Sequence, residues 1–504
     1  MLAVVAALAA LAVVSAQPVP DEDWGYVTIR PGAHSFWWLY GANTSARAEA
    51  PLILWLQGGP GASSTGFGNF AETGPLDWDL KPRASTWLNA PVNMLYVDNP
   101  VGAGFSYVDD LSLLPKTNAA IAADLVVLLA AFFATHPALQ SSPFFLFSES
   151  YGGKMSASLA PALLAAIDAG TVKANFKGYV MGDSWINGTA HVDAWCPFLR
   201  AVDLLDDAQL QQCLAPVREC DAATAAGDWA GAINAWGKTE GVIDSLTDGV
   251  DFYNILVHGS AGDISPRPPL ARLQTRRPEL QLGAAALALA PPGVCPRMLQ
   301  RLFTNHLSVY LGDPLDALMN GPIRAKLGVI PANVTWGGQS SAVFSALSGD
   351  FMRPVVAEVD AALAGGRINV TVEEGQLDLI CSNAGADLWM RQLQWEGMAG
   401  FYASAREPRY PSAEAQQLGA TSGFVKRYGT LTKYDGAWPH TRSTFSRPLL
   451  RHGARARART PQPLSPLCAS PLPPPAVLSA GHMVPSDNPQ GALAMVRELT
   501  GQEW

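Results

Sequence analysis

Short apolar runs alternate with longer helical patterns through the first third of the chain. Five runs have the apolar and aromatic character of buried strands: 35–40, 52–56, 93–98, 144–147 and 177–182. Between them, residues 117–135 and 155–167 repeat apolar side chains with the period of a helix. Strands and helices that alternate at these lengths predict an α/β fold, with a mostly parallel central sheet covered by helices on both faces.

The pattern changes at about residue 185. From 185 to 347 it is helical and irregular, and this stretch contains four of the six cysteines. The alternation of helices and strands resumes with a helix at 351–364 and a strand at 367–373. The last predicted element is a helix at 489–499. We therefore expect a core made of residues 17–184, 348–434 and 476–504. Residues 185–347 form an inserted, largely helical cap over the active-site face.

Residues 435–475 do not resemble the rest of the chain. They contain six arginines, nine prolines and no Glu or Lys, whereas the whole protein carries a net charge of −9. This composition predicts either a disordered surface loop or a retained intron or gene-model error, and we favour the second. Removing the segment would join 431–434 to 476–479 and restore a strand.

Composition and the first residues indicate the compartment. The 504 residues are 48% hydrophobic, and the acidic balance argues against nucleic acid or an anionic membrane surface as a partner. Residues 1–16 are almost wholly Ala, Val and Leu and end in Val-Ser-Ala, which predicts a signal peptide too short to span a bilayer. We expect no membrane span elsewhere and a mature protein of the secretory pathway, lysosomal or secreted.

Sequons and cysteines agree with that compartment. Four N-x-S/T sequons predict glycosylation sites at Asn43, Asn187, Asn333 and Asn369. The six cysteines predict one or two disulfides, drawn from Cys196, Cys213, Cys220 and Cys295. Neither a C-x-x-C motif nor a Cys/His cluster with metal spacing occurs, so we expect no metal and no cofactor.

The run at 144–147 ends in Ser-Glu-Ser-Tyr-Gly-Gly at 148–153, and a helical pattern follows at once. In a sharp turn between strand and helix, the middle residue, Ser150, projects its hydroxyl clear of the sheet. The helix N-terminus then lies where a substrate oxyanion would form. This is the nucleophile elbow of an α/β-hydrolase fold, with Ser148 in place of the usual first glycine. Alone, the pattern also suits an ordinary strand and a glycine turn.

Three further segments supply what such a nucleophile needs. Gln-Gly-Gly-Pro-Gly at 57–61 follows a strand and lets the backbone approach a substrate, so Gly59 and Tyr151 are the expected oxyanion donors. Asp378 follows the strand at 367–373, and His482 stands in a loop before the last helix. Each residue alone has a commoner structural role, but the order Ser, Asp, His predicts a catalytic triad.

Five motifs, at 55–61, 98–107, 149–153, 375–378 and 481–485, occur in the order and form typical of serine carboxypeptidases, and the chain resembles that family. The resemblance implies Ser150, Asp378 and His482 as the triad, and Gly59 and Tyr151 as oxyanion donors. It also implies that the substrate's free carboxylate binds to three residues and that a second acid pairs with one of them. These positions are Gln57, Gly58 and Glu149, with Glu72 as the second acid; Gln57 replaces the family's Asn.

Two crowded carboxyls cannot both ionise cheaply, so one retains its proton to a higher pH than a free acid. A protonated Glu149 could donate a hydrogen bond to a peptide's C-terminal carboxylate, which predicts carboxypeptidase activity at acidic pH on peptide C-termini. One alternative is acyl transfer or ester hydrolysis on the same residues. Another is a secreted binding or scaffold protein with an impaired site. The sequence leaves the oligomeric state open, and a homodimer is one state it allows.

Overall fold

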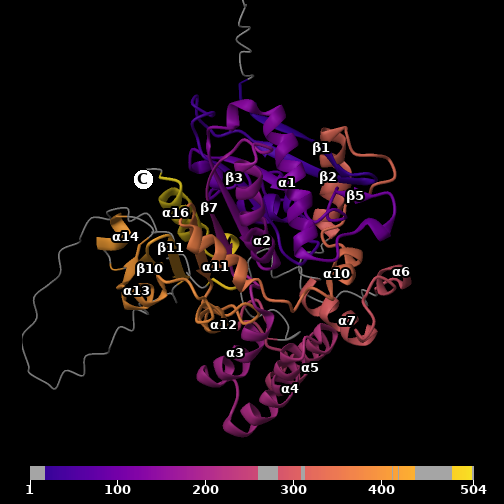
Figure 1. Ribbon diagram of the computed structural model, residues 1–504, viewed down its shortest axis with the longest axis vertical. Coiled ribbons are helices and arrows are strands. Elements are labelled where there is room, and N and C mark those ends of the chain that lie inside the picture. The colour runs from indigo at the N-terminus through magenta and orange to yellow at the C-terminus, as the bar shows by residue number, and fades with distance from the viewer. Residues whose placement is uncertain are drawn as a thin grey trace, which may run out of the picture.

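The computed structural model describes residues 18–258, 282–307, 313–410, 413–417, 419, 421–436 and 480–501. The expected signal peptide and residues 437–475 of the Pro- and Arg-rich segment lie outside this range. An eleven-stranded sheet forms the centre (Figure 1). Its strands are β1 (Glu22–Arg30), β2 (Ala33–Tyr40), β3 (Leu52–Leu56), β4 (Asn93–Val97), β5 (Tyr107–Val108), β6 (Pro143–Glu149), β7 (Asn175–Gly182), β8 (Asn369–Glu374), β9 (Arg406–Arg409), β10 (Gly423–Tyr428) and β11 (Leu431–Gly436).

The sheet is parallel at its centre and antiparallel at both edges. The strand order is β1-β2-β4-β3-β6-β7-β8-β11-β10-β9, and β5 pairs with β2. The six strands from β4 to β11 along this order pair in parallel, whereas β1, β2 and β5 at one edge and β9 and β10 at the other pair antiparallel. All the predicted strands are present, and the predicted parallel sheet is confirmed for the centre.

Helices cover both faces of the sheet. Side chains alternate between the faces of a strand, and on β2 Trp37 packs against Phe132 while its neighbour Trp38 packs against Phe70. Phe132 belongs to α1 and Phe70 to η1, so these two helices lie on opposite faces. The elements around the sheet are α1 (Asn118–Thr135), α2 (Tyr151–Asp168), α11 (Val356–Gly365), α12 (Asn383–Met390), α13 (Met398–Ala403), α14 (Ala413–Gln417), α15 (Val484–Asp487), α16 (Pro489–Leu499), η1 (Ser64–Thr73), η2 (Trp87–Asn89), η3 (Leu111–Leu113) and η4 (Pro137–Leu139).

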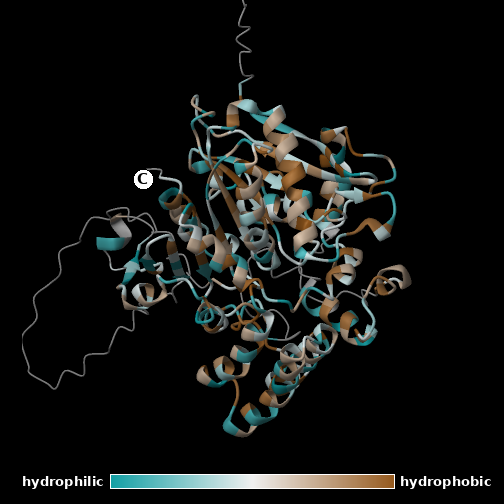
Figure 2. Cartoon of the chain, viewed as in Figure 1, coloured by the Kyte–Doolittle hydropathy of each residue, from teal (hydrophilic) through white to brown (hydrophobic). Residues whose placement is uncertain are grey.

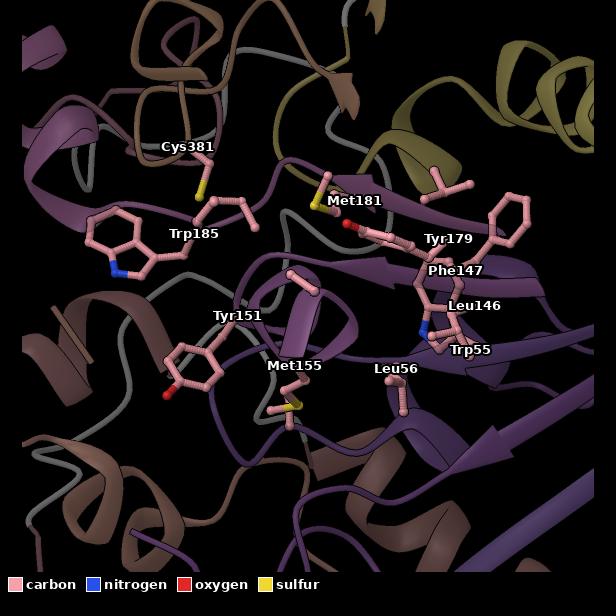
Figure 3. Close-up of a cluster of buried hydrophobic side chains, with 14 of the residues drawn as sticks. Trp55, Leu56, Leu146, Phe147, Tyr151, Met155, Tyr179, Met181, Trp185 and Cys381 are labelled. Atoms are coloured by element: carbon pink, nitrogen blue, oxygen red, sulfur yellow. The ribbon is translucent and has the colours of Figure 1, made fainter. Parts of the chain in front are cut away.

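The core is densest around the central strands. Every residue of β3 and β4 is buried, as expected for parallel strands covered on both faces. Hydrophobic residues gather on these strands and on the helices that cover them (Figure 2). In Figure 3, Trp55, Leu146 and Phe147 from neighbouring strands lie close to one another, and Tyr151 and Met155 project from α2. The nucleophile elbow therefore begins in the best-packed part of the molecule.

The first long helix, α1, is strongly apolar. α1 spans 18 residues and, by length and composition, could cross a membrane, but half of it is buried against the rest of the protein. Its N-cap is Thr117, whose side chain accepts a hydrogen bond from the backbone N–H of Ala120. It packs against α2 and β1. Its composition is therefore that of a core helix, as the periodicity at 117–135 predicted.

Helices dominate the segment expected to be a cap. They are α3 (Gly188–Ala201), α4 (Asp207–Ala225), α5 (Trp229–Thr247), α6 (Ala284–Leu287), α7 (Pro296–Leu302), η6 (Phe303–Leu307), α8 (Asp313–Leu318), η8 (Met319–Ile323), α9 (Arg324–Leu327) and α10 (Ser341–Leu347). α3, α4 and α5 project together from one end of the sheet (Figure 1). A disulfide between Cys196 and Cys213 joins α3 to α4, which confirms the expectation of at least one bridge among the first four cysteines.

One predicted helix begins later than expected. The pattern at 351–364 predicted a helix from Phe351, but α11 starts at Val356. Pro354 lies in the intervening segment, and a proline disfavours helical backbone at the residue before it. The carbonyl of Phe351 instead accepts hydrogen bonds from Lys154 on α2 and from the indole of Trp185. The Phe351 carbonyl is thus hydrogen-bonded to side chains of other elements instead of to the backbone of a helix.

Candidate active site

Ser150 stands in a sharp turn between β6 and α2. Its backbone has φ 60° and ψ −125°, a positive φ that non-glycine residues seldom adopt. The conformation is held from both sides, because Ser150 N–H donates to the Gly182 carbonyl at 3.0 Å and Trp185 N–H donates to the Ser150 carbonyl at 3.1 Å. Ser148, which replaces the usual glycine, is buried and donates its hydroxyl to the Val180 carbonyl at 2.7 Å. The turn has the form of a nucleophile elbow.

The loop after β3 lies directly against this turn. A Cβ atom on Gly58 would come within 2.5 Å of the Ser150 Cβ, so only glycine allows the approach. Gly59 has φ +107°, a backbone conformation that favours glycine. A Cβ on Gly152 would meet the Leu56 carbonyl oxygen at 2.3 Å. Glycines therefore bring the two expected oxyanion segments together.

His482 and Asp378 form a buried pair. The Nδ1 of His482 lies 2.8 Å from Oδ2 of Asp378, and neither side chain has exposed surface. The other ring nitrogen, Nε2, has no hydrogen-bond partner among the described residues. His482 and Glu149, the residue before Ser150, line one small cavity. His482 thus lies at a cavity that the residue before Ser150 also lines, and among the described residues no hydrogen bond joins Ser150 to His482.

Backbone contacts fix the histidine loop. His482 N–H donates to the Tyr253 carbonyl at 2.8 Å, and the Tyr253 ring packs edge-on against the imidazole at 4.8 Å. Gly481 N–H donates to Asp487 at 2.8 Å, and the Ala480 carbonyl accepts from Leu377 N–H at 3.1 Å. Sequence reasoning missed both residues, because Tyr253 precedes His482 by 229 positions and Asp487 lies just outside the motif at 481–485.

Asp183 is a further residue that sequence reasoning missed. It follows β7 with φ 38°, and its Oδ1 accepts the N–H of Gly375 at 2.7 Å. Gly375 begins the loop that carries Asp378. Burial, followed by the charge of Asp378, raises the pKa of Asp183 well above its usual range. A neutral Asp183 can hold the Asp378 loop without adding a second negative charge there.

The structure also places a thiol beside the pair. Potential ligand atoms of Asp378, Cys381 and His482 lie within 4.8 Å of one another, a cluster that sequence spacing did not reveal. Burial raises the pKa of the Cys381 thiol well above its usual range, which favours the protonated form over the thiolate that binds metals. The Nδ1 of His482 already pairs with Asp378. We assign no ion to this cluster.

Glu72 and Glu149 form the acid pair that the motifs implied. Both are buried, on η1 and β6, and their carboxyls are close enough to interact electrostatically. Burial raises the pKa of Glu72 to about 7, and burial together with the charge of Glu72 raises that of Glu149 well above its usual range. At least one carboxyl of the pair is therefore protonated in acid solution.

Gln57 is bound into the same group. Its Nε2 donates to Oε1 of Glu149 at 2.9 Å, and its Oε1 accepts from the Trp55 indole at 2.8 Å. The additional methylene, relative to the asparagine usual in the resembled family, therefore still leaves both ends of the amide bound. Gln57 and Gly58 follow β3 and Glu149 ends β6, so these three residues lie at the carboxyl ends of two neighbouring strands.

A network behind Tyr151 fixes the first turn of α2. The Tyr151 hydroxyl accepts from Asn118 Nδ2 at 3.1 Å, and Asn118 also donates to Asp350 at 2.9 Å. Lys154 is fully buried and donates to the carbonyls of Asp350 and Phe351 at 2.6 and 2.9 Å. Tyr151 stacks on Phe351 with ring centroids 5.3 Å apart. The backbone N–H of Tyr151 thus belongs to a rigid helix start.

Asp98 explains the motif at 98–107, to which sequence reasoning gave no role. Its buried carboxylate accepts four hydrogen bonds, at 2.7 to 3.0 Å, from the Ser63 hydroxyl, from the N–H and hydroxyl of Thr65, and from Phe105 N–H. These bonds tie the motif to the start of η1, which follows the 57–61 loop and carries Glu72. Asp98 therefore supports the glycine loop indirectly.

The predicted glycosylation sites differ in exposure. Asn43, Asn333 and Asn369 are exposed. Asn187 is 7% exposed, caps α3 through its Oδ1, and donates its Nδ2 to Gln392 at 3.0 Å. A glycan requires an exposed amide nitrogen, so the structure argues against the prediction at Asn187. The sequence of a sequon does not tell whether its asparagine is buried. Only the fold separates Asn187 from the three exposed sites.

Comparisons with known proteins agree with the geometry. The family model described as serine carboxypeptidase matches residues 15–435. The retinoid-inducible serine carboxypeptidases of Mus musculus and Homo sapiens are 40% and 41% identical to the chain; the alignments cover 97% and 96% of the chain and 93% and 92% of those proteins. Serine carboxypeptidase-like 51 of Arabidopsis thaliana is 36% identical, over 95% of the chain and 92% of that protein.

A solved structure shares the fold. The crystal structure of a prohormone-processing carboxypeptidase from Saccharomyces cerevisiae superposes with a TM-score of 0.67, at 18% identity, over 95% of this chain and 91% of that one. This likeness confirms the predicted α/β-hydrolase fold. Because the family model spans most of the chain and the relatives are about 40% identical over nearly its whole length, the protein belongs to the serine carboxypeptidase family and is a serine-type carboxypeptidase.

Proposed function

We propose that the enzyme releases C-terminal amino acids from peptides through an acyl-enzyme on Ser150, with Asp378 and His482 as its partners. The observation that carries this proposal is the buried 2.8 Å contact between Asp378 and His482, together with a serine held at φ 60° in the turn after Glu149. Asp378 binds Nδ1 of His482, which leaves Nε2 as the ring nitrogen that can accept a proton.

Each step of the reaction uses groups at this site. His482 Nε2 takes the Ser150 proton as Oγ bonds to the scissile carbonyl carbon, and the backbone N–H groups of Gly59 and Tyr151 bind the resulting oxyanion. The carbon–nitrogen bond then breaks, and His482 gives its proton to the departing amino acid. Water attacks the ester by the same route, returning the proton to Ser150 and releasing the shortened peptide.

The acid pair accounts for C-terminal specificity and acidic pH. A protonated Glu149 can donate a hydrogen bond to the substrate's carboxylate, with Gln57 and Gly58 beside it, whereas an ionised Glu149 would repel it. Because burial raises the pKa of Glu72 to about 7 and that of Glu149 well above its usual range, the pair holds a proton in acid and loses it as the pH rises. We propose that the enzyme recognises free C-termini best in acid.

Location and modification follow from the same proposal. A hydrophobic leader at 1–16, one disulfide and acid-dependent recognition suit a lysosomal or secreted enzyme. We propose glycans at Asn43, Asn333 and Asn369, which are exposed. We also propose the division into a core at 17–184, 348–434 and 476–504 and a cap at 185–347.

The test is release of the C-terminal residue from an N-blocked dipeptide at about pH 5. The native chain should be active and Ser150→Ala inactive. Ser156→Ala, a truncation of a nearby serine that is buried on α2, is the matched control and should retain activity. Activity that survives Ser150→Ala would refute the assignment of the nucleophile. An inactive native chain would refute the proposed acidic peptidase reaction.

A further inference from the structure

The end of the cap segment is paired with the glycine loop that follows β3. Ser340 N–H donates to the Gly61 carbonyl at 2.9 Å, and Ser63 N–H donates to the Gly338 carbonyl at 3.1 Å. Between these bonds, Ala62 and Gln339 form an antiparallel bridge. Residues 338–340 thus act as a short strand beside the loop at 57–61, although almost 280 positions separate them.

The Gln339 side chain enters the loop itself. It is only 6% exposed, and its Nε2 donates to the Pro60 carbonyl at 2.6 Å and to the Ser340 carbonyl at 3.3 Å. A Cβ on Gly59 would lie 2.7 Å from Oε1 of Gln339, and one on Gly61 would lie 2.9 Å from its Nε2. The amide therefore fills the space that glycine leaves open on both sides of Pro60.

The loop needs an external brace. Gly59 and Gly61 have φ values of +107° and +103°, and glycine loses more conformational freedom on folding than any other residue. Positions 58–61 contain only glycine and proline, so the loop has no polar side chain with which to hold itself. An oxyanion donor must nevertheless be aimed within a few tenths of an ångström, because donors act at about 2.7–3.1 Å from the developing charge.

We infer that Gln339 is a positioning residue for the oxyanion hole, holding the Pro60 carbonyl so that the N–H of Gly59 stays aimed at the transition state. The inference rests on the proposed role of Gly59. Trp336 supports the same contact by donating its indole N–H to the Ser63 hydroxyl at 3.0 Å. Because the oxyanion forms only during reaction, loss of Gln339 should lower kcat and leave KM nearly unchanged.

Two substitutions test this inference by changing the side chain that donates a hydrogen bond to the Pro60 carbonyl. Gln339→Met keeps the shape and removes the donor, so kcat should fall about tenfold to a hundredfold at every pH, with KM within about twofold. Gln339→Glu restores a donor only when its carboxyl is protonated. Its kcat relative to the native enzyme should be near normal in acid and fall as the pH rises, because a carboxylate repels both the Pro60 carbonyl and the oxyanion.

Gln140→Met is the matched control, since Gln140 also donates to a backbone carbonyl, that of Phe133 at 2.8 Å, at the end of α1. It should leave kcat unchanged. Two results would overturn the inference, provided that the native enzyme and Ser150→Ala behave as proposed. One is an unchanged kcat in Gln339→Met, and the other is a kcat of Gln339→Glu, relative to the native kcat, that does not vary with pH. If Gln339→Met fails to fold, the pH dependence of Gln339→Glu decides alone. An inactive native chain would instead refute the proposed function.

Discussion

Replacing Glu149 by glutamine separates recognition of the substrate carboxylate from the ionisation of the acid pair. The new amide keeps an oxygen that can accept the bond from Gln57, at 2.9 Å in the native site, and a nitrogen that can donate to the substrate at any pH. We therefore expect KM in acid to stay close to the native value. Above the raised pKa of Glu149 the variant should bind free C-termini better than the native enzyme.

The structure sets the size of the effect. Both carboxyls are buried, so an ionised Glu149 that faces a substrate carboxylate would be an uncompensated buried charge, which costs about 3–5 kcal/mol. That is a loss in affinity of about a hundredfold to several thousandfold. In the native enzyme the loss should develop at about tenfold per pH unit above the pKa of Glu149. In Glu149→Gln this decline should be absent.

The assay is KM for an N-blocked dipeptide between pH 5 and 9, measured beside kcat. The matched substrate is the same dipeptide as its C-terminal amide, which has no carboxylate, so its binding should not follow the ionisation of Glu149. An alkaline rise in KM that is identical in Glu149→Gln and the native enzyme would refute the reasoning. So would an equal rise for the acid and the amide substrate.

The same pair makes stability depend on pH. Because burial raises the pKa of Glu72 to about 7 in the folded state, its neutral form is favoured there, and stability is greatest below the unfolded pKa near 4.5. As the pH rises from 4.5 to 7 the unfolded chain loses this proton first, and stability should fall by about 3 kcal/mol. Glu72→Gln should flatten that decline in thermal unfolding. A melting temperature that falls equally in both proteins would contradict the assignment.

Three further changes test the site and its frame. Asp378→Asn should lower kcat about 10⁴-fold in steady-state assays with little change in stability, because an amide stabilises the wrong tautomer of the histidine; a loss under tenfold would contradict the pair. Gly58→Ala should reduce activity at least a hundredfold, since its Cβ would lie 2.5 Å from that of Ser150; native kcat would exclude the close approach. Replacing residues 437–479 by a short Gly/Ser linker should preserve kcat and raise stability by about 2 kcal/mol, through a shorter loop closure. A lost peptidase activity would show that the segment is needed.

The sequence predicted the interior of the fold better than its edges. The strands β3 and β4 are almost wholly apolar, β6 and β7 each contain an apolar stretch, and α1 begins after the capping residue Thr117, so pattern and chemistry agree. At the edge, β9 is Arg-Glu-Pro-Arg, mostly exposed, and nothing in its composition indicates a strand. η1, which carries Glu72, is buried at all ten positions and mixes glycine, polar and aromatic residues, so it lacks the exposed polar face from which a helix is inferred.

The site was predictable where chemistry is local and unpredictable where it depends on distant contacts. The elbow, the glycine loop and the order Ser, Asp, His follow from short motifs. The bond from Gly375 to Asp183 joins residues 192 apart, and that from Gln339 to Pro60 joins residues 279 apart. Such contacts depend on how distant segments pack against one another in the fold. The hydrophobic periodicity of the sequence does not show this packing. Burial likewise separates Asn187 from the three exposed sequons.

The position of His482 depends on contacts that lie outside the Pro- and Arg-rich segment. β11 pairs in parallel with β8 and ends at Gly436, where a Cβ would lie 3.9 Å from the Cβ of Ala480. The chain therefore leaves and re-enters the core at almost the same point, and the 43 residues from 437 to 479 lie between these two neighbours in the sequence.

From Ala480 onward, each anchor of the histidine loop found among the described residues comes from outside the Pro- and Arg-rich segment. Tyr253 holds the His482 backbone and packs on its ring, Asp487 holds Gly481, and Asp378 holds Nδ1. A strand running directly into the loop is therefore not required to place the imidazole. Because loop-closure entropy grows only with the logarithm of length, an insertion at this point costs stability without moving the base. The catalytic geometry should thus be the same whether the segment is long or short.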